Sequence, residues 1–289
     1  MFPERFLSSE GGRSVIVLIG VGDLGARIGA HLADEGHRII GVRRDAAKVP
    51  ERFEARSADI TDPASLKAAA TGLDAEELAV VFTVTAGQRT EDAYQQTYVQ
   101  GMRAVVEALK PQRLVAVSST AVYGVRDGSW VDESTPAEPT VFSGQAMVDM
   151  EQVAAAAVPS ASSVRLGGVY GPGRTRFVDQ VRAGKAGYGP TPAYTNRIHV
   201  DDAARLVAAL AVADVVPPVV LGVDDEPASR ADVITWIAGR LGVAVPDMDP
   251  EFVPMTNKRC RNTLAHSVGF EPRYPTFRDG YEALVSLDS

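Results

Sequence analysis

The chain has 289 residues of ordinary globular composition, with 45% hydrophobic and 23% charged residues. These values exclude a disordered, collagen-like or coiled-coil protein, and the length fits one large domain or two lobes. The 37 acidic residues outnumber the 29 basic ones, and the formal net charge is −8. This balance argues against binding to nucleic acids or acidic membranes, because both need a basic surface.

The single cysteine, Cys260, cannot form an internal disulfide or a cysteine-based zinc site. The four histidines lack the spacing of metal ligands, so we expect no metal. Neither residues 1–13 nor the stretch 206–223 has the uninterrupted apolar core of a signal peptide or membrane span. We therefore expect a cytoplasmic protein.

The first half of the chain alternates apolar strand patterns with helical patterns. We expect strands at 15–19, 38–42, 53–58, 78–85, 114–118 and 163–166. We expect helices at 25–35, from 62 onward, at 93–109 and at 147–157. Asp62 and Pro63 are residue types that begin helices, as N-cap and first helical residue. This order predicts an α/β fold, a doubly wound parallel Rossmann sheet with ligand sites at the carboxyl edge of its strands.

Glycine and proline become frequent after residue 171, which indicates a less regular region. We expect a dinucleotide-binding domain over residues 1–170 and a smaller C-terminal substrate lobe over 171–289. Helices are expected at 201–213, 230–241 and 277–287, with a strand at 219–223. Within this lobe, segment 197–223 is expected to return to the main sheet.

The pattern G-x-G-x-x-G follows the first strand directly and opens the first helix, over residues 20–25. In this position the first glycine allows a tight turn, the second admits a pyrophosphate, and the third lets the helix pack on the strand. A purely structural turn is the alternative. We assign five residues of this turn to a dinucleotide site: Gly20, Gly22, Asp23, Leu24 and Gly25.

Arg43 and Arg44 stand at the end of the second strand, where an NAD site normally has an acidic residue for the ribose 2′-hydroxyl. Guanidinium groups instead suit a 2′-phosphate, because they donate charge-assisted bidentate hydrogen bonds. The alternative is a solvated surface pair. The sequence therefore favours NADP over NAD.

Six further segments stand in a fixed order along nearly the whole chain. They are ADITD at 58–62, VTAG at 84–87, VSSTAVYG at 117–124, DESTP at 132–136, RLGGVYGPG at 165–173 and NRIHVDD at 196–202. Together with the glycine turn, they resemble the motifs of the extended or atypical short-chain dehydrogenase/reductase superfamily, in its NAD-dependent epimerase/dehydratase-like branch.

The resemblance implies further cofactor-binding residues. Asp59 and Ile60 would contact adenine, Thr85 and Ala86 would lie beside the nicotinamide ribose, and Ser118 belongs to the serine-rich motif of the fifth strand. It also implies an oxidoreductase or epimerase/dehydratase-like enzyme for a small polar or sugar-like substrate, with a homodimer as a family expectation.

The helix after the serine-rich motif departs from the family pattern Tyr-x-x-x-Lys. The matching stretch is FSGQAMVDME, at 142–151. One register puts Ser143 and Met147 in the two positions, and a shift by one residue gives Phe142 and Ala146. Neither register supplies the tyrosine or the lysine, so we do not expect the family's Tyr–Lys proton transfer here.

Three hydroxyl residues remain as catalytic candidates. Ser119 matches the family's catalytic serine and would hydrogen-bond the substrate, with a strand-end backbone contact as the alternative. Tyr123 is an acid/base only if a cation lowers its pKa, and is otherwise a pocket-wall residue. Ser143 would contact the substrate or, in the simpler interpretation, cap the helix.

Five residues in the later motifs are assigned to the substrate: Tyr170, Arg174, Asn196, Arg197 and His199. The arginines with Asn196 would clamp a carboxylate or phosphate. His199 is alternatively a buried structural residue. The basic run that begins at Lys258 is interpreted as solvated surface.

Two functions follow as hypotheses. The first is an NADP(H)-dependent enzyme whose chemistry differs from the family's Tyr–Lys proton transfer. The retained Ser119 supports this hypothesis. The second is a non-catalytic NADP(H)-binding redox sensor, which would not need the missing dyad. A third possibility is a different reaction on the same fold, with the cofactor structural.

Overall fold

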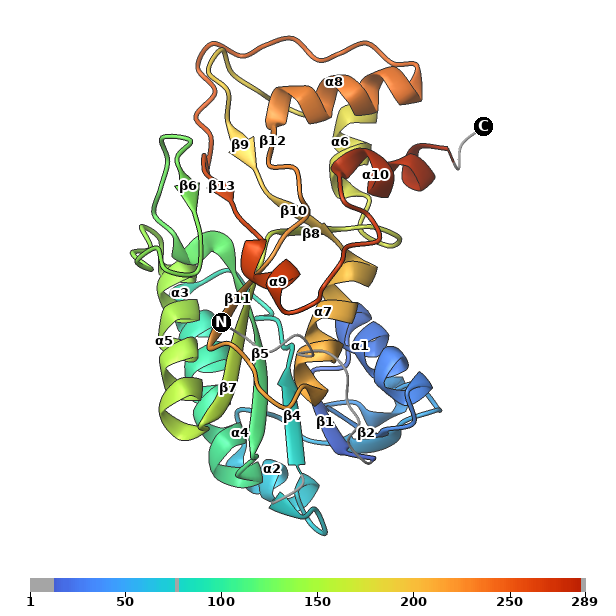
Figure 1. Ribbon diagram of the computed structural model, residues 1–289, viewed down its shortest axis with the longest axis vertical. Coiled ribbons are helices and arrows are strands. Elements are labelled where there is room, and N and C mark those ends of the chain that lie inside the picture. Colours follow the sequence, from blue (N-terminus) through green and yellow to red (C-terminus); the bar gives the residue numbers. More distant parts are fainter. Residues whose placement is uncertain (1–12, 76–77, 287–289) are drawn as a thin grey trace.

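The computed structural model describes residues 13–75 and 78–286. The predicted N-terminal stretch before residue 13 and residue 287 of the predicted last helix lie outside them. At the centre is a seven-stranded parallel sheet, in the order β11-β7-β5-β4-β1-β2-β3 (Figure 1). Its strands are β1 (Val15–Ile19), β2 (Arg38–Arg43), β3 (Glu54–Ser57), β4 (Leu78–Phe82), β5 (Arg113–Ser119), β7 (Ser160–Leu166) and β11 (Val219–Gly222). The α/β fold class predicted from the sequence is confirmed.

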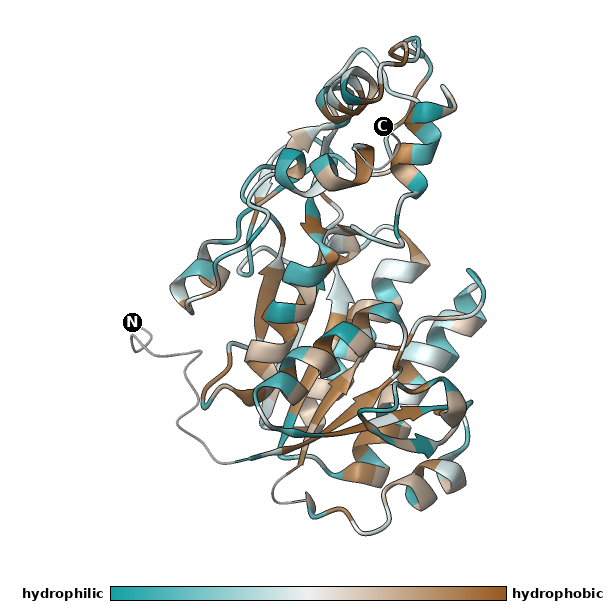
Figure 2. Cartoon of the chain, turned by 90° about the vertical axis from the view of Figure 1, so that its right-hand side faces the viewer, coloured by the Kyte–Doolittle hydropathy of each residue, from teal (hydrophilic) through white to brown (hydrophobic). Residues whose placement is uncertain are grey.

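The central strands are apolar on both faces because helices cover both. Ile16 and Leu18 of β1 pack into one core cluster, and the alternating residues Val17 and Ile19 pack into another. The first face is covered by α1 (Asp23–Asp34) and α7 (Val200–Val212). The second is covered by α2 (Pro63–Ala69), α4 (Gly101–Leu109) and α5 (Phe142–Ala157). Figure 2 shows most strands of the sheet as brown, apolar ribbon, beside helices in which teal and brown residues are mixed.

The helices on the second face differ in detail from the sequence expectation. The predicted helix at 93–109 is built as α3 (Glu91–Tyr94), a π-helical stretch (Gln95–Gln100) and α4. α5 begins at Phe142, five residues before its predicted start, after an extended Val141 that makes no side-chain cap. Ser143 is therefore the second helical residue, and its interpretation as N-cap is wrong. No helix in the described ranges is long and apolar enough to cross a membrane.

An upper lobe stands over the carboxyl edge of the sheet (Figure 1). It contains three two-stranded pairs: β8 (Gly168–Tyr170) with β10 (Arg197–His199), β9 (Tyr194–Thr195) with β12 (Ala228–Ser229), and β6 (Trp130–Val131) with β13 (Arg259–Cys260). Its helices are α6 (Arg176–Arg182), α8 (Arg230–Leu241), α9 (Thr263–Ser267) and α10 (Phe277–Val285). A third apolar cluster, with Val181, Ile234 and Phe277 at its centre, joins α6, α8 and α10.

The chain leaves the sheet after β7 and comes back to it. Residues from 168 to 199 run through the upper lobe, α7 then descends over the first face beside α1, and β11 pairs with β7 at the edge of the sheet. Glu133 covers that edge, because its carboxylate accepts a hydrogen bond of 2.8 Å from the Leu221 N–H. The two halves of the molecule are therefore interleaved in sequence.

Candidate functional site

The three glycines of the turn differ in the space around them. A Cβ on Gly25 would lie 2.4 Å from the Gly20 carbonyl oxygen. Gly20 has a φ of +93°, and a Cβ on it would lie 2.9 Å from the Val84 backbone nitrogen. A Cβ on Gly22 would meet no atom within 4 Å. Gly22 is also the N-cap of α1 and makes no side-chain cap bond. The helix therefore begins at an open space that suits an anion.

A cleft of about 690 Å³ runs from this turn past the ends of β2 and β4, and we call it the glycine-turn cleft. It is placed where the strand order reverses, beside β1, which is the usual ligand crevice of such sheets. Seven of the predicted cofactor-binding residues line it: Gly20, Gly22, Arg43, Arg44, Asp59, Ile60 and Thr85.

Cationic side chains gather at one end of the glycine-turn cleft. Arg43 Nη1 donates to the carbonyl oxygens of Val21 at 2.7 Å and Lys48 at 3.2 Å, so the guanidinium ties β2 to the turn. Arg44 and Lys48 are exposed and also line the cleft. Hydrogen bonds from the N–H and hydroxyl of Thr61, with a smaller contribution from Arg44, lower the pKa of Asp59.

Four predicted cofactor residues have other contacts. Asp23 forms ion pairs with Arg27 at 2.9 Å and Arg174 at 3.0 Å, which keep its pKa low against the opposing effect of burial. Leu24 packs at the border of the first core cluster. The Ala86 N–H donates to the Tyr98 hydroxyl at 3.3 Å. Ser118 is buried beneath the site.

Ser118 belongs to a buried network that the sequence interpretation did not foresee. Its hydroxyl donates to Glu151 of α5 at 2.5 Å, and Arg165 of β7 donates to the same carboxylate at 2.7 Å. Arg165 Nη1 also donates to the Tyr123 hydroxyl at 2.8 Å. That hydroxyl donates in turn to the Asp132 carbonyl oxygen at 2.9 Å. Burial raises the pKa of Tyr123 to about 12 in spite of the nearby Arg165, so the phenol is neutral near pH 7.

A second cavity, of about 460 Å³, lies at the carboxyl end of β5, and we call it the Lys258 cavity. The three predicted catalytic residues, Ser119, Tyr123 and Ser143, all contribute to its wall. Ser119 Oγ accepts from the Ala121 N–H at 3.1 Å, a contact that leaves its hydroxyl hydrogen for another acceptor. Lys258 also lines this cavity.

The interpretation of Lys258 as solvated surface is wrong, because the residue is only 4% exposed. Its ammonium donates to the Tyr123 carbonyl oxygen and to Thr256 Oγ1, each at 3.0 Å. No pattern in the sequence indicated this burial, because β13 has only two residues, Arg259 and Cys260, and Lys258 precedes it. Arg259 stacks its guanidinium over Trp130 and Tyr194.

A third cavity, of about 630 Å³, lies under the upper lobe, and we call it the arginine cavity. Four guanidiniums contribute to it: Arg174, Arg176, Arg197 and Arg230. Phe177 packs against two of them, Arg197 and Arg230. Burial lowers the pKa of Arg230, with Arg197 acting in the same direction. The cavity shares Thr120, Gly168 and Thr256 with the Lys258 cavity, so the two are adjoining.

The remaining predicted substrate residues have structural contacts of their own. Asn196 lines the arginine cavity, but its amide donates to the Lys258 carbonyl oxygen at 3.1 Å and accepts from the Cys260 N–H at 2.7 Å. Tyr170 stacks on Tyr281 at 4.3 Å, and burial raises its pKa. His199 Nδ1 accepts from the Asp201 N–H at 3.3 Å and caps α7, which is the structural alternative expected for it.

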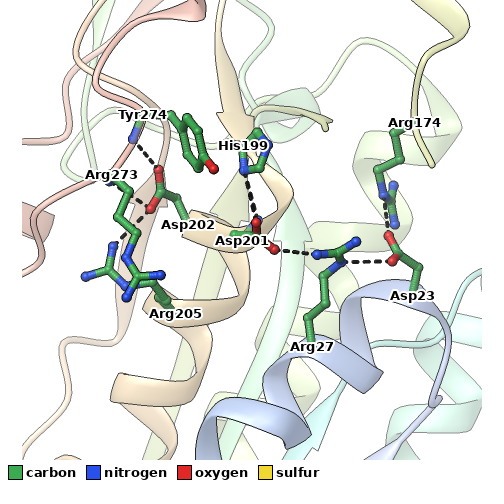
Figure 3. Close-up of polar contacts among 9 residues, drawn as sticks. All are labelled: Asp23, Arg27, Arg174, His199, Asp201, Asp202, Arg205, Arg273 and Tyr274. Atoms are coloured by element: carbon green, nitrogen blue, oxygen red, sulfur yellow. Dashed lines mark hydrogen bonds and ion pairs between the residues drawn. The ribbon is translucent and has the colours of Figure 1, made fainter. Parts of the chain in front are cut away.

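Polar contacts join the upper lobe to the sheet helices (Figure 3). Arg174 reaches down to Asp23 at the start of α1, and Arg27 bridges from Asp23 to Asp201 of α7. The fully buried Asp202 accepts from the backbone N–H groups of Arg273 and Tyr274, both at 2.9 Å. The upper lobe and the helices α1 and α7 are therefore held together by ion pairs and hydrogen bonds around the three cavities.

Known proteins resemble this chain in both sequence and fold. A curated relative, the dTDP-6-deoxy-L-talose 4-dehydrogenase (NAD(P)(+)) of Kitasatospora kifunensis, is 32% identical over 173 residues. The match covers 55% of this chain and 54% of the relative, so the chain spans about half of that protein's length.

Solved structures match over nearly the whole chain. A Methylobacillus flagellatus protein assigned to the NAD-dependent epimerases/dehydratases has a TM-score of 0.81 at 32% identity, covering 95% of this chain and 98% of its own. The Bordetella bronchiseptica enzyme WbmG, solved in complex with NAD, has a TM-score of 0.75 at 20% identity, covering 96% and 94%. The second likeness shows the fold alone.

The family model named NAD dependent epimerase/dehydratase matches residues 16–221, from β1 to β11. That range includes the glycine-turn cleft and most of the wall of both other cavities. The chain therefore belongs to the NAD dependent epimerase/dehydratase family.

Proposed function

We propose that this chain is an NADP(H)-dependent oxidoreductase or epimerase/dehydratase-like enzyme for a small polar or sugar-like substrate. The observation that carries the proposal is the cationic end of the glycine-turn cleft, where Arg43 and Arg44 replace the acid that usually ends β2 in NAD sites. The curated relative, whose name includes NAD(P)(+), supports a nicotinamide cofactor of either kind.

The residues of the cleft fit such a cofactor. The free space at Gly22 accommodates a pyrophosphate at the N-terminus of α1. Arg44 and Lys48 are exposed for a 2′-phosphate, and Arg43 offers the donors that its two carbonyl contacts do not use. When bound, the dinucleotide supplies the carbon that donates or accepts a hydride, and the protein binds and orients it.

The two further cavities would hold the substrate. Ser119 would donate its hydroxyl hydrogen to a substrate oxygen in the Lys258 cavity. The guanidiniums of the arginine cavity favour a substrate that carries a carboxylate or a phosphate. The predicted roles of Arg174 and Arg197 in substrate binding, and of Asn196 and Tyr170 as cavity wall, are part of this proposal.

The cofactor is tested by titration with NADPH and NADH. We expect NADPH to bind at least about tenfold more tightly, and Arg44→Ala to weaken NADPH by about 10- to 100-fold while NADH changes little, since a charge-assisted hydrogen bond is worth about 1.5–3 kcal/mol. Arg52→Ala is the matched control, because Arg52 is exposed and pairs with Asp34 at 2.6 Å, away from the cleft wall. Equal affinities for the two cofactors would contradict the assignment.

A non-catalytic NADP(H)-binding sensor is the second candidate. The observation in its favour is α5, whose residues 142–157 include neither tyrosine nor lysine. Purified protein should be mixed with NADPH and a panel of aldehydes, ketones and nucleotide sugars while the absorbance of the reduced nicotinamide is followed. Turnover that Ser119→Ala abolishes supports the enzyme. Tight NADPH binding without turnover, with a partner whose affinity depends on redox state, supports the sensor. The homodimer remains a prediction.

A further inference from the structure

Lys258 is a buried amine for which the structure shows no acidic partner in the described ranges. An isolated ammonium in a protein interior is costly, so such a group is usually paired or has a role. Its two hydrogen bonds go to neutral oxygens, the Tyr123 carbonyl and Thr256 Oγ1. An ammonium has three hydrogens, and the third is left for a ligand in the cavity that Lys258 lines.

The backbone around Lys258 is fixed from both sides. The Asn196 amide holds the Lys258 carbonyl oxygen and the following Cys260 N–H. β13 pairs with β6 directly after Lys258, and the Arg259 stack on Trp130 secures that pairing. The backbone on either side of Lys258 is therefore held in place, and its side chain lines the same cavity as Ser119 and Ser143.

The surroundings of the Lys258 amine favour its neutral form, compared with a lysine in water. Burial lowers the pKa of Lys258, and the Arg126 charge acts in the same direction. Cys260 opposes this shift, but its own pKa is raised by burial to about 12, so its thiol is neutral near pH 7. Arg89 is a second cation on the cavity wall. A lysine in such surroundings exchanges protons nearer to neutral pH than a surface lysine does.

We propose that Lys258 binds the reacting oxygen of the substrate opposite Ser119 and exchanges a proton with it, in the place of the tyrosine that α5 lacks. This inference rests on the proposed function. In the direction of reduction, the carbonyl carbon takes a hydride with its two electrons from the reduced nicotinamide. The π electrons of the C=O bond move to the oxygen, and that oxygen takes a proton from the Lys258 ammonium. The products are an alcohol, the oxidised dinucleotide and a neutral amine that regains its proton from water. Oxidation reverses each step.

The protonation of Lys258 is tested without any substrate by competitive acetylation. The folded protein is labelled with trace acetic anhydride over a range of pH, and each lysine is quantified by mass spectrometry. We expect the reactivity of Lys258 to rise at a lower pH than that of Lys67, an exposed lysine of α2. A titration of Lys258 at or above that of Lys67, or no labelling at any pH, would overturn the proposal.

The role in proton transfer is tested on the same carbonyl panel with NADPH. Lys258→Met should lower turnover by about 10²- to 10⁴-fold, the usual effect of a general acid, while its NADPH affinity stays as in the wild type. Lys258→Arg should fold, and the pH dependence of turnover that the amine imposes should disappear, because a guanidinium stays protonated. Lys67→Met is the control and should behave as the wild type.

The outcomes separate the two proposals. Unchanged turnover and pH profile in folded Lys258→Met would contradict the role of Lys258 and leave the cofactor assignment intact. Failure of the wild type to bind NADPH would contradict the proposed function, whatever the labelling shows. If Lys258→Met does not fold, Lys258→Arg and the acetylation profile decide.

Discussion

At the scale of single residues, substitutions of Gly22 and Gly25 distinguish an effect on cofactor binding from an effect on stability. Gly22→Ala places a methyl group in open space, so we expect a loss of stability below about 1 kcal/mol but at least a tenfold loss of NADPH affinity. Gly25→Ala drives a methyl group to 2.4 Å from the Gly20 carbonyl oxygen, and overpacking of this kind costs about 1–3 kcal/mol. Urea unfolding and NADPH titration measure the two effects. Wild-type NADPH affinity in Gly22→Ala would show that no pyrophosphate lies at the turn.

The buried His199 makes stability depend on pH. Burial lowers its pKa from 6.5, although Asp201 and Asp202 oppose the shift and Arg27 adds to it. The unfolded chain therefore binds more protons near pH 6, so this stability is present above pH 6.5 and is lost as the pH falls toward the lower folded value. We expect the free energy of unfolding to fall between about pH 7.5 and 5.5, and to fall less in His199→Asn, which can still cap α7.

Urea unfolding at the two pH values measures this difference. His31→Asn, in the last turn of α1, is the matched control substitution. An identical pH dependence in His199→Asn would mean that other groups cause it.

At the scale of elements, the Glu151–Arg165 pair fastens α5 to β7 and, through Ser118, to β5. Glu151→Ala leaves a buried guanidinium without its carboxylate, and we expect a loss of about 3–5 kcal/mol. The double variant Glu151→Met with Arg165→Met removes both charges and should lose less than the single variant. Urea unfolding compares them, and a single variant that is the more stable of the two would refute this account.

The sequence was informative about elements whose pattern is local. β1 and β4 were expected because their apolar runs are buried on both faces, and α2 because Asp62 caps it and Pro63 begins it. The start of α5 was misplaced because Val141, an uncapped apolar residue, precedes it. β13 was missed because its two residues are too few to show an alternating pattern, and its partner β6 lies far away in the sequence.

At the scale of the whole molecule, Asp202 ties α7 to the segment that leads to α10. Asp202→Asn keeps one oxygen for its three donors, Arg205 and the N–H groups of Arg273 and Tyr274, so we expect a loss of about 1–3 kcal/mol. Hydrogen exchange of α10 should quicken in this variant. Asp201→Asn, its half-exposed neighbour, should cost below about 1 kcal/mol. Equal effects of the two substitutions would contradict the importance of burial.

The site as a whole depends on contacts between residues far apart in the sequence, which no local sequence pattern indicates. The glycine turn and the end of β2 were found because strand, turn and helix follow each other in sequence. Ser119 and Lys258 line one cavity only because the upper lobe folds back over β5. The ion pair from Arg174 to Asp23 likewise joins residues 151 positions apart. Such pairings follow from the three-dimensional path of the chain and could not be predicted from composition or periodicity.

The late position of α7 and β11 in the chain has a consequence for biosynthesis. Sheet residues that α7 covers, such as Val81 and Val115, have all been synthesised when β7 ends at Leu166, whereas α7 ends only at Val212. At about 5–20 residues per second, this apolar face of the nascent sheet waits for about 2–9 seconds before α7 is complete. The nascent chain therefore exposes this face until α7 has been synthesised, and we expect chaperones to bind it during that period.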